Sequence, residues 1–293
     1  MFGRIIIAAA LAAALAGGAT TQAGAQQLAN PGQPAATPSG WVFNVAPYVW
    51  MPTLSTSLKF NVPAAPGSTV TADSNVGFGD LLSHMNSAVM LAADAQYGPF
   101  SLLTDFVYLN LGATSAHFNS IKFFNQNPLP ITRSSRLFTG LNVNGGIWTL
   151  AGGYTVASGD WGRLDVIAGL RYLPLNARLN YNLSVMVSDP SGSGKTFGGA
   201  GGSVSGSVDI WNGIGGVRGR IRLGDKGLFI PYYLDAGAGG SQFTWQIASG
   251  LGYHMHWGDV SLTYRYLTFE QNKDAVFQRM TVYGPMIMVN FTF

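Results

Sequence analysis

The sequence predicts an all-β protein, an antiparallel up-and-down transmembrane β-barrel of about ten strands, with twelve as the alternative. Strand-like segments with alternating apolar and polar residues recur from residue 41 to residue 293, as lipid-facing and lumen-facing positions do in such barrels. Only 10% of the residues are charged and 39 are glycine, whereas about 25% are charged in an ordinary soluble domain. The sequence contains no apolar run of about 18 residues, the length that a membrane-spanning helix needs.

The N-terminal residues have the three parts of a secretory signal peptide. Arg4 carries a positive charge, Ile5 to Leu15 are apolar, and Ala23-Gly-Ala25 fits the A-x-A cleavage pattern. We therefore expect cleavage before Gln26 and export through the periplasm to the bacterial outer membrane. The next residues are rich in Pro, Ala and Gln, which favours a disordered lead-in. The predicted divisions are a signal peptide, a lead-in and one barrel domain, at residues 1–25, 26–40 and 41–293.

The composition excludes several functions. Cysteine is absent, so we expect no disulfide, no thiol chemistry and no lipid anchor on a cysteine. The formal net charge is only +3, which gives no case for nucleic acid. We expect no cofactor and no metal. The predicted partners are outer-membrane lipid and lipopolysaccharide and the barrel assembly machinery, with small solutes as candidate cargo.

Ten segments are predicted to be strands, because apolar and polar residues alternate in them with a period of two. Tight turns and longer polar connections mostly alternate between the segments, which is typical of short periplasmic turns and long extracellular loops. The expected long loops are 62–85, 113–135, 184–206 and 271–279. The expected strands are 41–60, 86–97, 100–112, 136–157, 161–183, 207–223, 227–239, 242–257, 259–270 and 280–293.

Two strands carry specific expectations. The first is predicted to be one long strand, although Pro47 and Pro52 weaken it because proline cannot donate to the ladder. One strand there gives an even total of ten, whereas three shorter ones would give twelve. In segment 207–223, Gly215-Gly216 is a candidate bulge that would switch which face the following residues occupy.

The last strand ends on an aromatic residue. Ile287, Val289, Phe291 and Phe293 lie on one face of it, because alternate side chains of a strand point to opposite sides. This resembles the final strand of outer-membrane proteins, which the assembly machinery reads. Phe291 and Phe293 are therefore the predicted assembly signal, and deletion of Phe293 should lower the yield of folded, heat-modifiable protein.

Charged residues recur on the predicted inner faces of the strands. An arginine or lysine on the lipid face would cost about 2–4 kcal/mol at mid-bilayer, so these residues are expected in the lumen. They form either a selectivity ring or a structural salt-bridge plug, and a barrel of this size favours a plugged or very narrow lumen. The arginines predict a locally positive periplasmic end, unless Asp165 and Asp235 neutralise them. The set is Asp94, Asp105, Asp165, Asp235, Arg171, Arg218, Arg220, Arg222 and Arg265.

Three motifs suggest other chemistry but are incomplete. Residues 189–196 end like a nucleotide-binding P-loop but lack its first glycine and the strand–helix context. His254 and His256 share a strand face, yet no third metal ligand is near in sequence. Asp80, Ser83 and His84 contain the residue types of a hydrolase triad, but a short helical turn explains them equally well. We therefore predict no catalytic residue and no metal site.

Several short motifs, in this order, resemble a group of poorly characterised proteobacterial outer-membrane barrel proteins. The resemblance implies a porin-like outer-membrane protein and brings no catalytic residue or known substrate. The motifs are Trp41-Val-Phe-Asn-Val-Ala-Pro-Tyr-Val-Trp50, Phe78-Gly-Asp-Leu-Leu82, Asp105-Phe-Val-Tyr-Leu109, Gly250-x-Gly-Tyr253, Tyr264-Arg-Tyr-Leu267 and Gly284-Pro285 with Phe291-Thr-Phe293.

The sequence leaves three functions open. The first is a porin-like small-solute channel or a structural outer-membrane protein. The second is a lipid hydrolase or acyltransferase, for which Ser83 and His84 are the candidates. The third is a surface protein that acts through loops 113–135 and 184–206.

Overall fold

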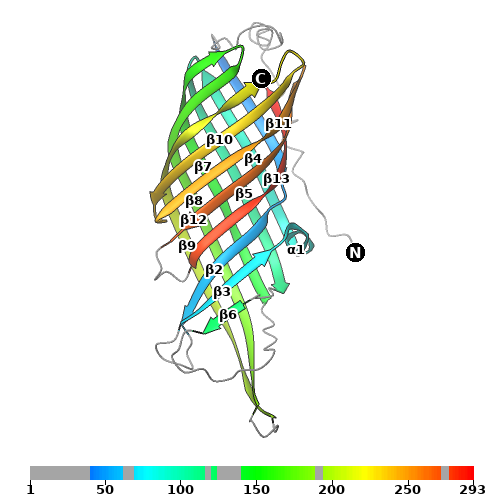
Figure 1. Ribbon diagram of the computed structural model, residues 1–293, viewed down its shortest axis with the longest axis vertical. Coiled ribbons are helices and arrows are strands. Elements are labelled where there is room, and N and C mark those ends of the chain that lie inside the picture. Colours follow the sequence, from blue (N-terminus) through cyan, green and yellow to red (C-terminus); the bar gives the residue numbers. More distant parts are fainter. Residues whose placement is uncertain (1–39, 62–68, 116–119, 124–139, 189–193, 272–276) are drawn as a thin grey trace, which may run out of the picture.

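The described part of the chain forms a closed antiparallel barrel of ten strands (Figure 1), so ten strands is confirmed over twelve. The computed structural model describes residues 40–61, 69–115, 120–123, 140–188, 194–271 and 277–293, and the predicted signal peptide lies outside them. Each strand pairs with the next, and β13 pairs with β1 to close the ring. The ten strands are β1 (Trp41–Trp50), β4 (Met85–Tyr97), β5 (Phe100–Ser115), β7 (Gly140–Gly159), β8 (Gly162–Ser188), β9 (Gly194–Arg222), β10 (Leu228–Gly239), β11 (Phe243–Met255), β12 (Gly258–Glu270) and β13 (Phe277–Thr292).

The first and last strands close the barrel through backbone hydrogen bonds. The Phe43 N–H donates to the Phe293 oxygen at 3.1 Å, and the Phe293 N–H donates to the Phe43 oxygen at 2.8 Å. Phe293 keeps its ring exposed, at 71% of its surface. A closed ring leaves no unpaired sheet edge at this junction, and unpaired backbone groups are not tolerated in lipid.

The predicted long first strand is interrupted at Met51-Pro52. It continues as β2 (Thr53–Asn61), which follows the same partner strand: Trp50 pairs with Met286 of β13, and Thr53 pairs with Tyr283. On the other side, the ladder between β1 and β4 ends at Pro47. Both interruptions fall at prolines, because a proline nitrogen has no hydrogen to donate to the ladder.

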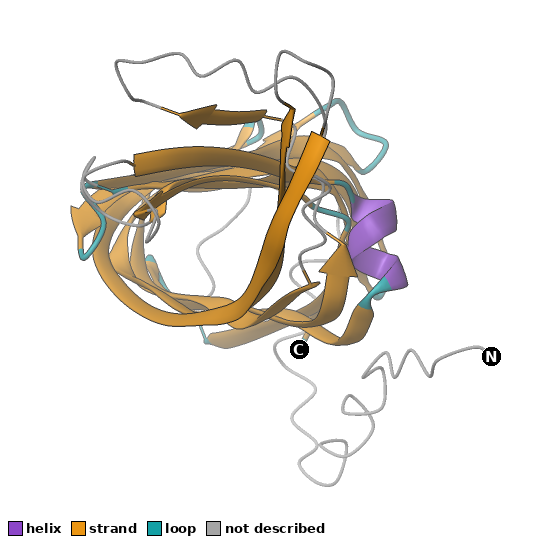
Figure 2. Ribbon diagram, turned by 90° about the horizontal axis from the view of Figure 1, so that it is seen from below, coloured by secondary structure: helices purple, strands orange, loops and turns teal. Residues whose placement is uncertain are grey.

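Three further elements lie outside the ring, where the sequence had predicted only loops. Strand β3 (Thr69–Val76) pairs with β2, and β6 (Ser120–Phe123) pairs with β3. Helix α1 (Phe78–Ser83) lies on the outside of the barrel wall (Figure 2), and it matches the short helical turn that the sequence suggested. Residues 62–85 and 113–135 were predicted to be loops. That prediction is wrong for β3 and β6, which add two strands to the free edge of β2.

The segment predicted as loop 184–206 is mostly strand. Strands β8 and β9 pair up to Ser188 and Gly194, and their hairpin extends beyond the barrel (Figure 1). An antiparallel ladder satisfies backbone groups whatever the side chains are, so the Gly- and Ser-rich start of β9 can pair with β8 beyond the barrel. Of the P-loop-like segment, residues 189–193 lie outside the described residues and Gly194–Thr196 belong to β9. No helix follows directly, as the nucleotide-binding motif would require.

The two ends of the barrel differ. Four tight turns join β4 to β5, β7 to β8, β9 to β10 and β11 to β12 at the end that also carries Phe293, and we call this the turn end. Gly98 and Gly224 have φ angles of +56° and +69° in these turns, which residues with a side chain rarely adopt. The opposite end, with the long hairpin, is called the loop end. Short turns predict that the turn end is periplasmic.

The outer surface is apolar and carries two bands of aromatic side chains, the arrangement of lipid-facing barrel surfaces. Ile247, Leu251 and Leu262 are exposed between the bands, as the alternation predicted. Strand β11 crosses both bands, with Tyr253 in the band toward the turn end and Trp245 in the band toward the loop end. The two residues are roughly 20 Å apart along the barrel axis. The two bands contain Trp41, Tyr97, Phe100, Tyr154 and Trp257 toward the turn end, and Trp148, Tyr172, Trp211, Trp245, Tyr266 and Tyr283 toward the loop end.

Among the described residues, no helix is both long and apolar enough to cross a membrane.

Strand β9 keeps one phase along its inner face. Its register with β10 runs without a shift from Asn212 to Arg222, through Gly215 and Gly216. The suspected bulge at the two glycines is therefore absent from this pairing. Asn212 and Ile214 are buried inside the barrel, so Arg218, Arg220 and Arg222 fall on the same inward face.

Candidate functional site: a charged cavity inside the barrel

A buried ion pair crosses the middle of the barrel interior. Arg171 of β8 donates from Nη1 to Asp235 Oδ1 at 2.9 Å, and from Nη2 to Asp235 Oδ2. Both side chains are 0% exposed. Thr149, Thr244 and Gln246 accept further hydrogen bonds from the guanidinium. The two-fold contact fits the planar fork of arginine and ties β8 to β10 on the inner side of the intervening strand β9.

A second buried arginine lies beside this pair. Arg265 of β12 donates to Asp105 at 2.7 Å and to Gln246 at 2.9 Å. Tyr48 donates to Asp105 at 2.5 Å, and the Arg265 guanidinium carbon lies 4.7 Å from the Trp50 ring centre. These contacts join β1, β5, β11 and β12 across the interior. The two buried arginines and their partners therefore form a polar layer, which we call the central plug.

Apolar side chains fill the barrel on the loop side of the central plug. Leu267 and Phe269 of β12 are both 0% exposed, and Trp50 is 1% exposed. They pack in one cluster with inward side chains of the facing strands, which we call the apolar layer. The cluster consists of Tyr48, Trp50, Val107, Ile147, Leu173, Ile210, Leu267, Phe269, Met280, Val282 and Met286.

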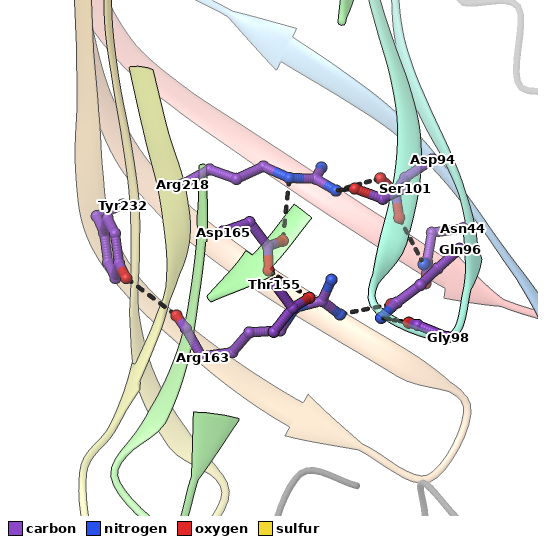
Figure 3. Close-up of polar contacts among 10 residues, drawn as sticks. All are labelled: Asn44, Asp94, Gln96, Gly98, Ser101, Thr155, Arg163, Asp165, Arg218 and Tyr232. Carbon is purple, nitrogen blue, oxygen red and sulfur yellow. Dashed lines mark hydrogen bonds and ion pairs between the residues drawn. The ribbon is translucent and has the colours of Figure 1, made fainter. Parts of the chain in front are cut away.

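A cavity of about 330 Å³ occupies the bore between the central plug and the turn end. On its walls Arg218 binds Asp94 and Ser101, while its Nε lies 3.4 Å from Asp165 (Figure 3). Arg163 donates to Asp165 at 2.6 Å and to Gln96 at 2.5 Å. These charged side chains keep about a fifth of their surface exposed or less. The cavity therefore has a group of partly exposed charged side chains on walls that are otherwise largely apolar.

Arg220 and Asp259 lie nearest the turn end of the cavity. Their ion pair is long, at 3.2 Å, and the Arg220 side chain is 45% exposed. Asp259 also contacts the His254 ring at 2.6 Å. The Arg220 guanidinium lies 5.0 Å from the Phe229 ring centre. This exposure shows that the cavity is open to solvent at the turn end.

A glycine makes room for the Phe229 ring. A Cβ atom on Gly252 would lie 2.3 Å from the ring, too close for any side chain to be accommodated without displacing it. Phe229 is buried and faces the cavity. The glycine thus sets the position of the aromatic surface against which Arg220 lies.

The predicted lumen residues all lie on inward-phase positions, in two groups. Arg171, Asp235, Arg265 and Asp105 form the central plug, whereas Asp94, Asp165, Arg218 and Arg220 line the cavity. Arg222 is half-buried at the end of β9. Each arginine lining the cavity has an aspartate partner. Asp165 pairs with Arg218, as the neutralised alternative predicted, but Asp235 pairs with Arg171 instead.

Sequence reasoning missed Arg163, Asp259, Tyr48 and Gln246. Arg163 lies in the same phase as Asp165 and Arg171, so alternation was enough to find it. Asp259 was the first residue of the predicted strand 259–270 but was not counted among the lumen residues, although it starts the inward face of β12. Tyr48 and Gln246 become part of the plug only through partners on distant strands.

The weaker candidate motifs do not assemble into sites among the described residues. Strand β11 ends at Met255, so His254 points to Asp259 while His256 is exposed in the turn. No group of His, Cys, Asp or Glu suited to a metal ion occurs in the described segments. Ser83 Oγ lies 2.8 Å from His84 Nδ1, and both atoms also contact the Asp80 backbone oxygen, at 2.8 and 2.9 Å. These contacts lie at the C-terminal end of helix α1 and involve the backbone oxygen of Asp80, not its carboxylate.

The comparisons with known proteins define the class of fold. No family model matches the chain, and no curated sequence matches it. The outer membrane protease OmpT from Escherichia coli matches with a TM-score of 0.54 at 10% identity, covering 88% of this chain and 98% of that protein. The translocator domain of autotransporter NalP from Neisseria meningitidis has a TM-score of 0.32 at 14% identity, covering 86% and 88%. The likeness to OmpT shows that the fold is that of an outer-membrane β-barrel, and at 10% identity it shows the fold alone.

Proposed function

We propose that this protein is an integral barrel of the bacterial outer membrane whose bore is closed, so that it is a structural or solute-binding protein rather than an open porin. The proposal includes removal of the signal peptide before Gln26, lipid and lipopolysaccharide around the outer surface, and insertion by the barrel assembly machinery. It assigns no catalytic role. The turn end faces the periplasm, and the long β8–β9 hairpin faces outward.

The buried Arg171–Asp235 pair is the observation that carries the closed bore. Its two side chains are fully buried and held from several sides. Hydrated ions would have to displace this pair and then cross the apolar layer, where Leu267 and Phe269 are also fully buried. A barrel of about eight strands is filled by its side chains, whereas porins with an aqueous channel have 16–18 strands.

Recordings in planar lipid bilayers test this proposal. The refolded, heat-modifiable protein should give no stable conductance steps above those of the bare bilayer. Conductance in Arg171→Ala combined with Asp235→Ala would show that the central plug is the main barrier, whereas no conductance would show that the apolar layer closes the bore by itself. Stable channel openings of the unmodified protein would overturn the closed bore.

A porin-like channel is the second candidate, and the cavity favours it because half of the bore is already open to solvent. In that case the central plug would act as a gate. Replacing Arg218 and Arg220 with Ala would change the ion preference of a channel, whereas in a closed barrel it would change only binding in the cavity or stability. A conductance whose ion preference ignores both substitutions would contradict the channel role of these arginines.

A further inference from the structure

Arginines are concentrated on one wall of the cavity. Arg163 of β8 and Arg220 of β9 are direct cross-strand partners, and Arg218 pairs in register with Asp165. Like charges placed directly opposite on neighbouring strands are destabilising. Asp165 lies on the same wall as the three arginines. Their other two acidic partners are Asp94 of β4 and Asp259 of β12. The structure thus keeps a costly group of positive charges beside an open cavity.

Each acid around the cavity is already paired with an arginine. Asp165 Oδ1 accepts from Arg163 and Thr155, and Arg218 Nε lies 3.4 Å from Asp165 Oδ2. Asp94 is bound by Arg218 and Asn44, and Asp259 by Arg220 and His254 (Figure 3 shows the first of these). A cation entering the cavity would have to break existing contacts to reach any of these carboxylates.

The arginines, in contrast, keep donors without a partner. Arg220 makes its hydrogen bond through Nη1, so its Nε and Nη2 have no partner among the described residues. Arg218 donates through Nη2, whereas its buried Nε lies 3.4 Å from Asp165 Oδ2 and makes no hydrogen bond in the described structure. Arg163 Nη2 and Thr263 Oγ1 are buried at the cavity wall without a hydrogen-bond partner in the described structure. Unused arginine donors beside carboxylates that are already ion-paired favour an anionic guest.

The position of Arg220 suits it to meet that guest. Its contact to Asp259 is long, at 3.2 Å, whereas Arg163 approaches Asp165 to 2.6 Å and Arg218 approaches Asp94 more closely still. Asp259 is shared with His254, and the Phe229 ring supports the guanidinium from one side. Arg218 lies two residues away on the same face, so the two side chains start roughly 7 Å apart. A carboxylate or phosphate group fits between two such guanidinium groups.

We propose that the cavity binds a small organic anion, whose oxyanion group lies between Arg218 and Arg220 and whose polar body lies against Asn44, Tyr232 and Thr263. A volume of about 330 Å³ is at the small end of ligand pockets. Entry is from the turn end. Only this one-sided access rests on the closed bore proposed above; the binding site itself does not depend on it.

Calorimetric titration of the folded protein in detergent micelles at low salt tests the site. The probes are glucose 6-phosphate and gluconate, with neutral glucose and cationic glucosamine as matched controls of similar size. Both anions should bind, and the two controls should give no heat above dilution. Binding of one anion alone supports the site and identifies whether it takes a phosphate or a carboxylate.

Arg220→Gln is the decisive variant, because the Arg220 side chain is exposed and its buried partner Asp259 keeps the contact with His254. It should weaken anion binding about tenfold or more, as expected for loss of a charged hydrogen-bond donor. Arg279→Gln, at the exposed Arg279–Glu270 pair, removes the same charge elsewhere and should leave binding unchanged. Heat-modifiable gel mobility checks that both variants are folded.

Three results would overturn this inference: neither anion binds, glucosamine binds more tightly than the anions, or folded Arg220→Gln binds them as tightly as the unmodified protein. None of these results bears on conductance. Conversely, stable channel openings in bilayers would overturn the closed bore and leave the calorimetric result standing.

Discussion

The two halves of the barrel interior are built from the same strands but hold opposite chemistry. On β12, the inward residues toward the turn end are Asp259, Ser261, Thr263 and Arg265, whereas the next two are Leu267 and Phe269. The change occurs at the central plug. The polar half encloses a cavity open to solvent, and the apolar half is packed among the described residues. One barrel thus combines a cavity that is open to solvent with a tightly packed apolar layer.

The difference follows from what each half can bury. Apolar side chains fill a bore of this width and gain free energy by leaving water. Charged side chains lose their hydration when buried, so they are stable only where ion pairs and hydrogen bonds replace the water. The plug residues satisfy this condition through contacts from several strands, and the cavity residues satisfy it partly through solvent. Each half can therefore be tested separately.

The largest effect is expected in the central plug. Arg171→Ala leaves Asp235 buried without its partner, which should cost about 3–5 kcal/mol of unfolding free energy. Urea unfolding in micelles, followed by tryptophan fluorescence, measures the loss. The double variant Arg171→Met, Asp235→Leu removes both charges and should lose much less. If the single and double variants are equally destabilised, the ion pair does not explain the stability of the plug.

The apolar layer should respond to loss of volume. Leu267→Ala removes a fully buried side chain and should cost about 2–5 kcal/mol in the same measurement. Leu262→Ala on the same strand is the control, because that side chain faces outward and is 57% exposed. Equal losses for the two variants would show that the loop half of the bore is not tightly packed.

The cavity half can be perturbed from behind Arg220. Gly252→Ala places a methyl group against the Phe229 ring, and such overpacking typically costs about 1–3 kcal/mol. Because the ring supports Arg220, we also expect weaker binding of glucose 6-phosphate. Unchanged stability and unchanged binding together would mean that Phe229 does not position the guanidinium.

The smallest effect is expected at the exposed ion pair of the loop end. Glu270→Gln weakens its pairing with Arg279, whose side chain is 62% exposed, and exposed pairs contribute about 0–1 kcal/mol. The unfolding free energy should therefore change by less than in any variant above, and less still at high salt. A loss as large as that of Arg171→Ala would remove the contrast between buried and exposed pairs.

Local sequence determined the barrel and the direction in which most side chains point. Alternation with a period of two is a property of the single strand, so Leu262 could be placed outward and Arg265 inward without knowing their neighbours. The cost of charge in lipid then placed the ladder of Asp and Arg inside. Tight turns at Gly98 and Gly224 fixed the connectivity. Strand number followed from parity once the first segment was taken as one strand.

The tertiary structure alone decided which inward residues meet. Arg171 of β8 contacts Asp235 of β10, past the intervening strand β9, and Arg218 of β9 contacts Asp94 of the distant strand β4. These encounters depend on the stagger of the strands and the width of the closed ring, which no single strand encodes. The same geometry decided that the interior is divided into a cavity and a packed layer, and that the residues after Met51-Pro52 leave the β4 edge to pair with β3. Alternation sets the face of each residue, but only closure of the sheet sets its partner across the interior.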